Sequence, residues 1–154
     1  MRIVERAARK FGLIPPEDQS DVDQIVELVA QARARTGRPP LRPAEALHHA
    51  AAGHSADMAT GEFVSHTGSD GSDPASRATA AGYPVGVLAE NLASGAADPS
   101  GVVRMWLDSP EHSTNLLDPA YTEIGAGHAC STTGTDYWAL TLASPEDRES
   151  SESP

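Results

Sequence analysis

The stretch from Met105 to Leu117 places a histidine at a chain reversal, where its chemistry can be argued from local structure. An apolar helical run ends at Ser109-Pro110, and a second short helix is expected to start at once. Ser109 can cap this helix, and Pro110 suits its first position because the N–H that proline lacks has no helical partner there. His112 then lies in the first turn, near free backbone N–H groups and the positive end of the helix dipole. This placement favours neutral imidazole, which binds a metal or accepts a proton; a surface histidine in a tight turn is an equally good interpretation.

Glu90 is a second residue that could do chemistry. It stands beside Asn91 in the segment Ala89–Gly95, which is otherwise mostly alanine and leucine. Burying a carboxylate without a partner is unfavourable. Glu90 is therefore expected either to be exposed on a turn or to be held by a partner such as a histidine or a backbone amide.

Length and charge set the outer limits on fold and function. The 154 residues fit one domain, and 22 acids against 11 Lys and Arg give a formal charge of -11. This charge argues against nucleic-acid binding, which needs basic patches, and against attraction to anionic membranes. No apolar run approaches the roughly 18 to 20 residues of a transmembrane helix. The one cysteine, Cys130, excludes an internal disulfide.

The first 19 residues are predicted to form a short basic amphipathic helix and a linker. The apolar residues of this segment recur at helical spacing and are Ile3, Val4, Ala7 and Phe11. Four basic residues stand among them. This helix is expected to pack on its own domain, or alternatively to dock a protein partner. The segment has neither the continuous apolar region nor the cleavage site of an export signal, so the chain as written is expected to be cytoplasmic.

Periodicity predicts long helices over about 21–35 and 43–59, and shorter helices that start near Pro74 and Pro99. Ser20 and Asp23 resemble a capping box for the first helix. His54 falls on the inward face of the second helix, where a packed, hydrogen-bonded histidine is expected rather than a metal ligand.

The last third of the chain is predicted to form an antiparallel hairpin of residues 121–130 and 137–142. Gly125 and Gly127 in its first strand predict that another element packs close to it. Residues 144–154 are acidic and serine-rich and are expected to be disordered. The predicted organisation is therefore residues 1–19, a folded domain over 20–143, and a tail over 144–154.

Four segments, in this order, resemble the CAP superfamily of cysteine-rich secretory proteins, antigen 5 and plant pathogenesis-related proteins, and most closely its bacterial SCP-like branch. They are Phe63–His66, Ala89–Gly95, Trp106–His112 and Glu123–Gly127. The resemblance spans about Val22 to Ala143. It implies an α+β fold, a three-layer α-β-α sandwich with an antiparallel central sheet and a central groove.

The resemblance also implies that His66, Glu90 and His112 line that groove. Two neutral imidazoles, His66 and His112, together with one carboxylate could hold zinc or another divalent metal with an open position. Without metal, Glu90 could orient an imidazole and leave its other nitrogen free as a base. Further candidates for the groove lining are Ser65, Ser109 and Glu111.

The sequence departs from the family pattern at two of these positions. Ser109 stands where eukaryotic members have a further acid, and Glu111 stands where bacterial relatives usually have glycine. Most relatives are secreted, so this chain is expected to be either an internal member or a domain separated from a longer precursor.

Three functions are compatible with the sequence. The favoured one is a noncatalytic groove that binds a small ligand, a lipid or a peptide, with the histidine–glutamate cluster as a polar or metal anchor. The second is a metal-dependent hydrolase in which Glu90 activates water as general base. The third is a protein-interaction module with a vestigial groove, in which the N-terminal helix makes the contact.

Overall fold

The computed structural model describes residues 16–147, and the side chains from Ser20 onward. The predicted N-terminal helix and most of the predicted tail lie outside these residues. The helices are α2 (Pro16–Arg35), α3 (Glu45–Gly61), α4 (Pro74–Ala80), α5 (Pro99–Leu107) and α6 (Pro110–Leu116), and the strands are β1 (Arg42–Pro43), β2 (Val85–Ser94), β3 (Glu123–Cys130) and β4 (Asp136–Pro145). In this part of the chain no helix is both long and apolar enough to cross a membrane.

The sheet has the strand order β1-β3-β4-β2. β4 is antiparallel to both of its neighbours, β3 and β2. The predicted hairpin is therefore confirmed, and β4 continues three residues beyond its predicted end. Two-residue β1 pairs in parallel with β3. β2 is the edge strand beside β4, although it precedes both β3 and β4 in the sequence.

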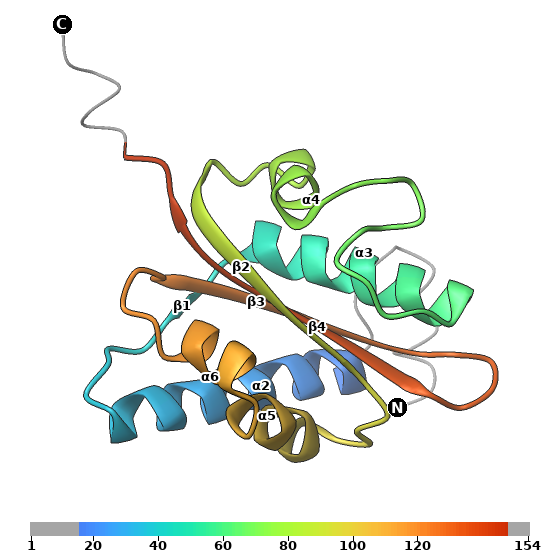
Figure 1. Ribbon diagram of the computed structural model, residues 1–154, viewed down its shortest axis with the longest axis horizontal. Coiled ribbons are helices and arrows are strands. Elements are labelled where there is room, and N and C mark those ends of the chain that lie inside the picture. Colours follow the sequence, from blue (N-terminus) through green and yellow to red (C-terminus); the bar gives the residue numbers. More distant parts are fainter. Residues whose placement is uncertain (1–15, 148–154) are drawn as a thin grey trace, which may run out of the picture.

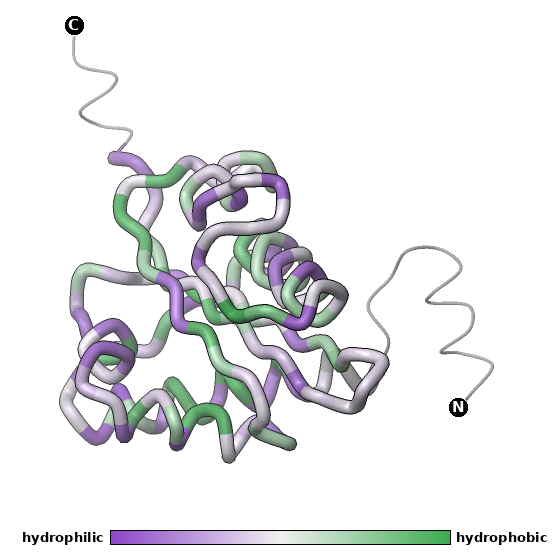
Figure 2. The backbone as a smooth tube through the Cα atoms, turned by 45° about the vertical axis from the view of Figure 1, so that its right-hand side comes forward, coloured by the Kyte–Doolittle hydropathy of each residue, from purple (hydrophilic) through white to green (hydrophobic). Residues whose placement is uncertain are grey.

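Helices cover both faces of this sheet. α3 packs on β3 and β4 and α4 packs on β2, whereas α2, α5 and α6 lie on the other face (Figure 1). Hydrophobic and hydrophilic residues alternate along the helices, as expected for elements with one side against the sheet (Figure 2). The three-layer α-β-α sandwich is confirmed.

Two glycines allow α3 to approach the sheet closely. A Cβ at Gly125 would collide with the backbone of Leu47 and His48, and one at Gly127 would collide with that of Ala51. The close packing predicted from these glycines is confirmed. It brings the inward face of α3, including His54, against the centre of the molecule.

The predicted start of the first helix is wrong. α2 begins at Pro16, so Ser20 and Asp23 lie inside the helix and form no capping box at its start. Proline suits the first turn of a helix, which explains the earlier start. Residues 85–94 form strand β2 although they show no apolar–polar alternation, because helices cover both of its faces.

Candidate functional site

Glu90 is buried on β2 and has a partner at each carboxylate oxygen. Its side chain is 3% exposed. His66 Nδ1 lies 2.8 Å from Oε1, and Arg77 Nη2 donates to Oε2 at 2.8 Å. Glu90 is predicted from the sequence either to be exposed on a turn or to be held by a partner such as a histidine. In the structure it is held by a histidine. The arginine compensates the charge of a carboxylate that has lost its water.

The backbone around His66 is held from two sides. The buried ring of His54, on α3, donates from Nε2 to the carbonyl of Ser65 at 2.7 Å. Arg77 Nη2 donates to the carbonyl of His66 at 2.9 Å. The packed, hydrogen-bonded state predicted for His54 is confirmed, and this bond positions the loop that carries His66.

Arg77 is a site residue that the sequence interpretation missed. It lies on α4, whose start is fixed by Pro74 and by a capping box between Asp73 and Ser76. Its Nη1 donates to the carbonyl of Ser72 at 2.9 Å, so the guanidinium joins the loop, the helix and β2. One cation in a short alanine-rich helix matches no motif, and only the fold shows that it faces Glu90.

The His66–Glu90 contact determines which nitrogen of the imidazole is free. A carboxylate only accepts hydrogen bonds, so Nδ1 carries the proton that is donated to Glu90. In the neutral ring Nε2 is then an unprotonated acceptor. The His66 side chain is 61% exposed, so this acceptor belongs to an accessible ring held by a buried acid.

α6, the helix that carries His112, packs on the other face of the sheet. Successive side chains of a strand point to opposite faces, and Glu90 reaches α4 whereas Asn91 donates to the carbonyl of His112 at 3.1 Å. Asn115 donates in turn to Asn91 at 3.0 Å. Within residues 16–147 His112 forms no hydrogen bond or ion pair with His66 or Glu90. That the three side chains share one groove stays a prediction.

The remaining candidates for the groove lining have local roles. Ser109 is the N-cap residue of α6, but its side chain makes no capping bond; Oγ lies 3.0 Å from His112 Nδ1 instead, so the predicted side-chain cap is wrong. The Ser65 hydroxyl accepts from the N–H of Thr67 at 3.1 Å. Glu111 is exposed in the first turn of α6.

The arrangement does not fit a metal held by three side chains. Among the described residues, no three His, Cys, Asp or Glu side chains are grouped so that they could hold a metal ion. Both oxygens of Glu90 already have partners. A metal held by His66 and His112 stays a prediction.

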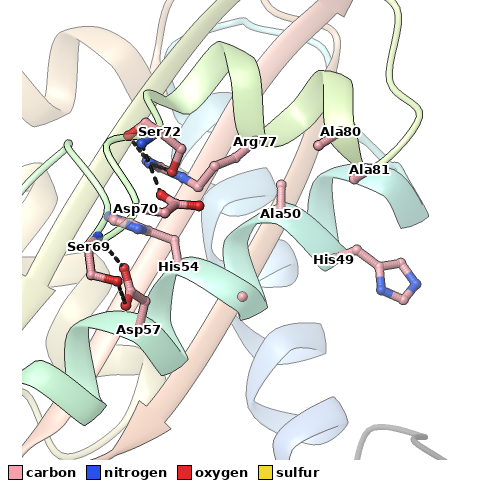
Figure 3. Close-up of a pocket in the computed structure, with 11 residues that line it drawn as sticks. His49, Ala50, His54, Asp57, Ser69, Asp70, Ser72, Arg77, Ala80 and Ala81 are labelled. Atoms are coloured by element: carbon pink, nitrogen blue, oxygen red, sulfur yellow. Dashed lines mark hydrogen bonds between the residues drawn. The ribbon is translucent and has the colours of Figure 1, made fainter.

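A pocket of about 420 Å³ opens on the far side of Arg77, between α3, α4 and the loop that joins them. Figure 3 shows Arg77 extending from α4 toward Ser72 at one wall, with His54 and Asp57 rising from α3 at the other. His66, Glu90 and His112 do not line it. The pocket thus lies next to the cluster formed by His66, Glu90 and Arg77, and Arg77 belongs to both.

A mixed sheet covered by helices on both faces, with a histidine from the loop after α3 held by an acid on the edge strand, defines a CAP-type sandwich. The family model described as cysteine-rich secretory protein family, CAP, matches residues 26–142. The chain belongs to this family, as the four segments predicted.

Known proteins resemble the chain in sequence and in fold. The uncharacterized protein YkwD of Bacillus subtilis is 31% identical over 105 residues, which are 68% of this chain and 41% of YkwD. The chain thus spans about two fifths of that relative. An extracellular SCP-domain protein of Bacillus anthracis has a TM-score of 0.75 at 23% identity, with 84% of this chain and 44% of that chain covered. An outer surface protein of Borrelia burgdorferi has a TM-score of 0.76 at 22% identity, with 82% and 94% covered.

Proposed function

We propose that this CAP domain is a binding domain that takes a small ligand, a lipid or a peptide at His66 without converting it chemically. The observation that carries the proposal is the buried Glu90, whose two oxygens are occupied by His66 and Arg77. Such an acid orients the imidazole and leaves Nε2 as an acceptor for an O–H or N–H group of the ligand. A hydrogen bond to His66 Nε2 can hold a ligand without any side chain that attacks it.

The same contacts disfavour a hydrolase in which Glu90 is the general base. A base must reach the proton of the attacking water, directly or through one further water. Glu90 is buried, and each of its oxygens already has a partner at 2.8 Å. The alternative of a protein-interaction module depends on the N-terminal helix, which lies outside the described residues.

The experiment is a ligand screen by NMR on the full ¹⁵N-labelled chain, with a fatty acid, a short peptide and zinc ions as separate probes. For any probe that binds, His66→Ala should weaken affinity by about tenfold or more. The loss of one hydrogen bond in a partly desolvated site lowers affinity by roughly a factor of ten. Thr60→Ala, which shortens an exposed side chain of α3 outside the pocket lining, is the control and should leave affinity unchanged.

Three results would contradict the proposal. One is a bound probe whose affinity is the same in His66→Ala and in the wild type, and another is the absence of binding by all probes. The third is a product released from a bound probe at a rate that falls in Glu90→Gln, which would favour the hydrolase. Stoichiometric zinc uptake that is lost in His66→Ala and in His112→Ala would instead identify the predicted metal as the ligand.

A further inference from the structure

A buried histidine nitrogen without a partner lies beside the pocket between α3 and α4. His54 is 1% exposed and lines the pocket, and its Nδ1 is the buried side-chain N or O atom that lacks a hydrogen-bond partner in residues 20–147. Nε2 donates to a carbonyl, Ser65 O, so Nδ1 of the neutral ring carries a lone pair. Leaving a buried acceptor unpaired is unfavourable, and a ligand with an N–H or O–H group would satisfy it.

Two carboxylates line the same pocket. Asp57 accepts from the N–H of Ser69 at 2.8 Å and from its hydroxyl at 2.6 Å, and Asp70 accepts from the N–H of Ser72 at 2.9 Å. Hydrogen bonds from Ser69 and from Ser72 hold the pKa of Asp57 and of Asp70, respectively, below the usual range. Both groups are therefore anionic at neutral pH. Among residues 16–147 neither forms an ion pair.

Arg77 also lines the pocket but does not neutralise it. Its Nη2 is engaged with Glu90 and with the carbonyl of His66, and its Nη1 with Ser72. Counting Asp57, Asp70 and Glu90 as negative and Arg77 as positive leaves an excess of negative charge. Figure 3 shows the carboxyl groups of Asp57 and Asp70 on either side of the His54 ring, which reaches from α3 toward the loop.

We propose that this pocket binds a small organic ammonium ion, which donates to His54 Nδ1 and is neutralised by Asp57 and Asp70. An ammonium group is the ligand chemistry that matches a lone pair and two carboxylates, because it supplies donors and positive charge and no acceptor. The pocket's volume of about 420 Å³ falls in the range of small-molecule sites. The inference does not rest on the proposed function, since His66 does not line the pocket.

The test titrates the full chain with 1,5-diaminopentane, monitored by calorimetry and by the ¹⁵N signal of His54 Nδ1. The neutral analogue 1,5-pentanediol is the chemical control. The diamine should bind about tenfold or more tightly than the diol, weaken as salt screens the carboxylates, and shift the Nδ1 signal. Absence of diamine binding, equal binding of the diol, or an unshifted Nδ1 signal would overturn the proposal.

Two pairs of variants locate the site. Asp70→Asn keeps the acceptor for the N–H of Ser72 and removes the charge, whereas Asp73→Asn makes the same change at the N-cap of α4, outside the pocket lining. The diamine affinity should fall about fivefold or more in Asp70→Asn and clearly less in Asp73→Asn, because a charge pair weakens with distance. Equal losses in the two variants would show a general charge effect and overturn the proposed site.

The second pair fills the pocket. Gly53 lines the pocket, and a Cβ there would meet no atom within 4 Å, so Gly53→Leu extends into open space without a backbone clash. Diamine affinity should fall about tenfold or more in this variant and stay unchanged in Ala56→Leu, which adds the same side chain at an exposed position of α3. Retained affinity in Gly53→Leu would place the diamine elsewhere and overturn the proposal.

Discussion

At the scale of single residues, histidines of this chain differ in chemistry because each has a different partner. His66 faces a carboxylate, His54 a carbonyl, and His112 a serine hydroxyl. In the first two cases the partner determines which ring nitrogen carries the proton. His112 could be singled out from its helix-start motif, and His66 through the family resemblance. The partner of His54 could not be predicted, because the carbonyl of Ser65 belongs to the loop beyond the end of α3.

His48 gives a prediction about pH. Burial lowers the pKa of His48 below its ordinary value of 6.5. In the fold its Nδ1 accepts from the N–H of Ala126 at 3.0 Å, a bond that protonation would break. The unfolded chain takes up a proton near pH 6.5 while the folded chain resists it. The unfolded state therefore binds more protons, and stability should fall as the pH drops through that value.

The measurement is urea unfolding of the wild type and of His48→Gln at about pH 7.5 and about pH 5.5. These values lie on either side of the pKa at which the unfolded chain takes up the proton. The loss of unfolding free energy on acidification should be smaller in His48→Gln than in the wild type. His49→Gln, at the exposed neighbouring position, should keep the loss of the wild type. An acid-induced loss of the same size in His48→Gln and the wild type would contradict the role of His48.

At the scale of elements, the contact between α3 and β3 depends on glycine. Gly127→Ala would push a Cβ into the backbone of Ala51, and overpacking of this kind destabilises a fold by about 1–3 kcal/mol. Gly53→Ala, in a helix with open space around it, should instead stabilise the fold by about 0.5–1 kcal/mol. Chemical denaturation of both variants measures the difference. A Gly127→Ala variant as stable as the wild type would show that α3 is not seated on β3 through this glycine.

Helices with a clear apolar stripe could be predicted from the sequence, and β2 could not. Val22, Ile25 and Val29 mark the inward face of α2, and all three are buried. β2 carries Glu90 and Asn91 side by side, so neither of its faces is uniformly apolar. Each of these polar side chains is satisfied by a different layer, Arg77 of α4 and the backbone of α6. A local pattern cannot reveal partners that tertiary contacts supply.

At the scale of the whole molecule, the candidate site is made by the fold from three separate segments. His66 comes from the loop after α3, Arg77 from α4, and Glu90 from the edge strand β2. The resemblance to the CAP family was enough to predict the sandwich and the pair His66 and Glu90. It could not predict Arg77 or the pocket beyond it, because both depend on how the loop of residues 68–73 is folded.

Long-range polar contacts also hold together the helices of the layer that contains α2 and α6. Arg33 on α2 is buried, and its Nη1 donates to the carbonyls of Leu116 at 2.9 Å and Asp118 at 3.1 Å. These carbonyls lie at and just beyond the end of α6, where a helix leaves its last acceptors without intrahelical partners. The arginine thereby ties the end of α6, the helix that carries His112, to α2.

The most direct test of the account is the tautomer of His66, measured by ¹⁵N NMR at a pH where its ring is neutral. If the fold brings loop, helix and strand together as described, the proton is on Nδ1 and Nε2 is unprotonated, and Glu90→Gln loses this preference while the fold is retained. A ring with its proton on Nε2, or a tautomer unchanged in Glu90→Gln, would contradict the claim that Glu90 prepares His66 for binding.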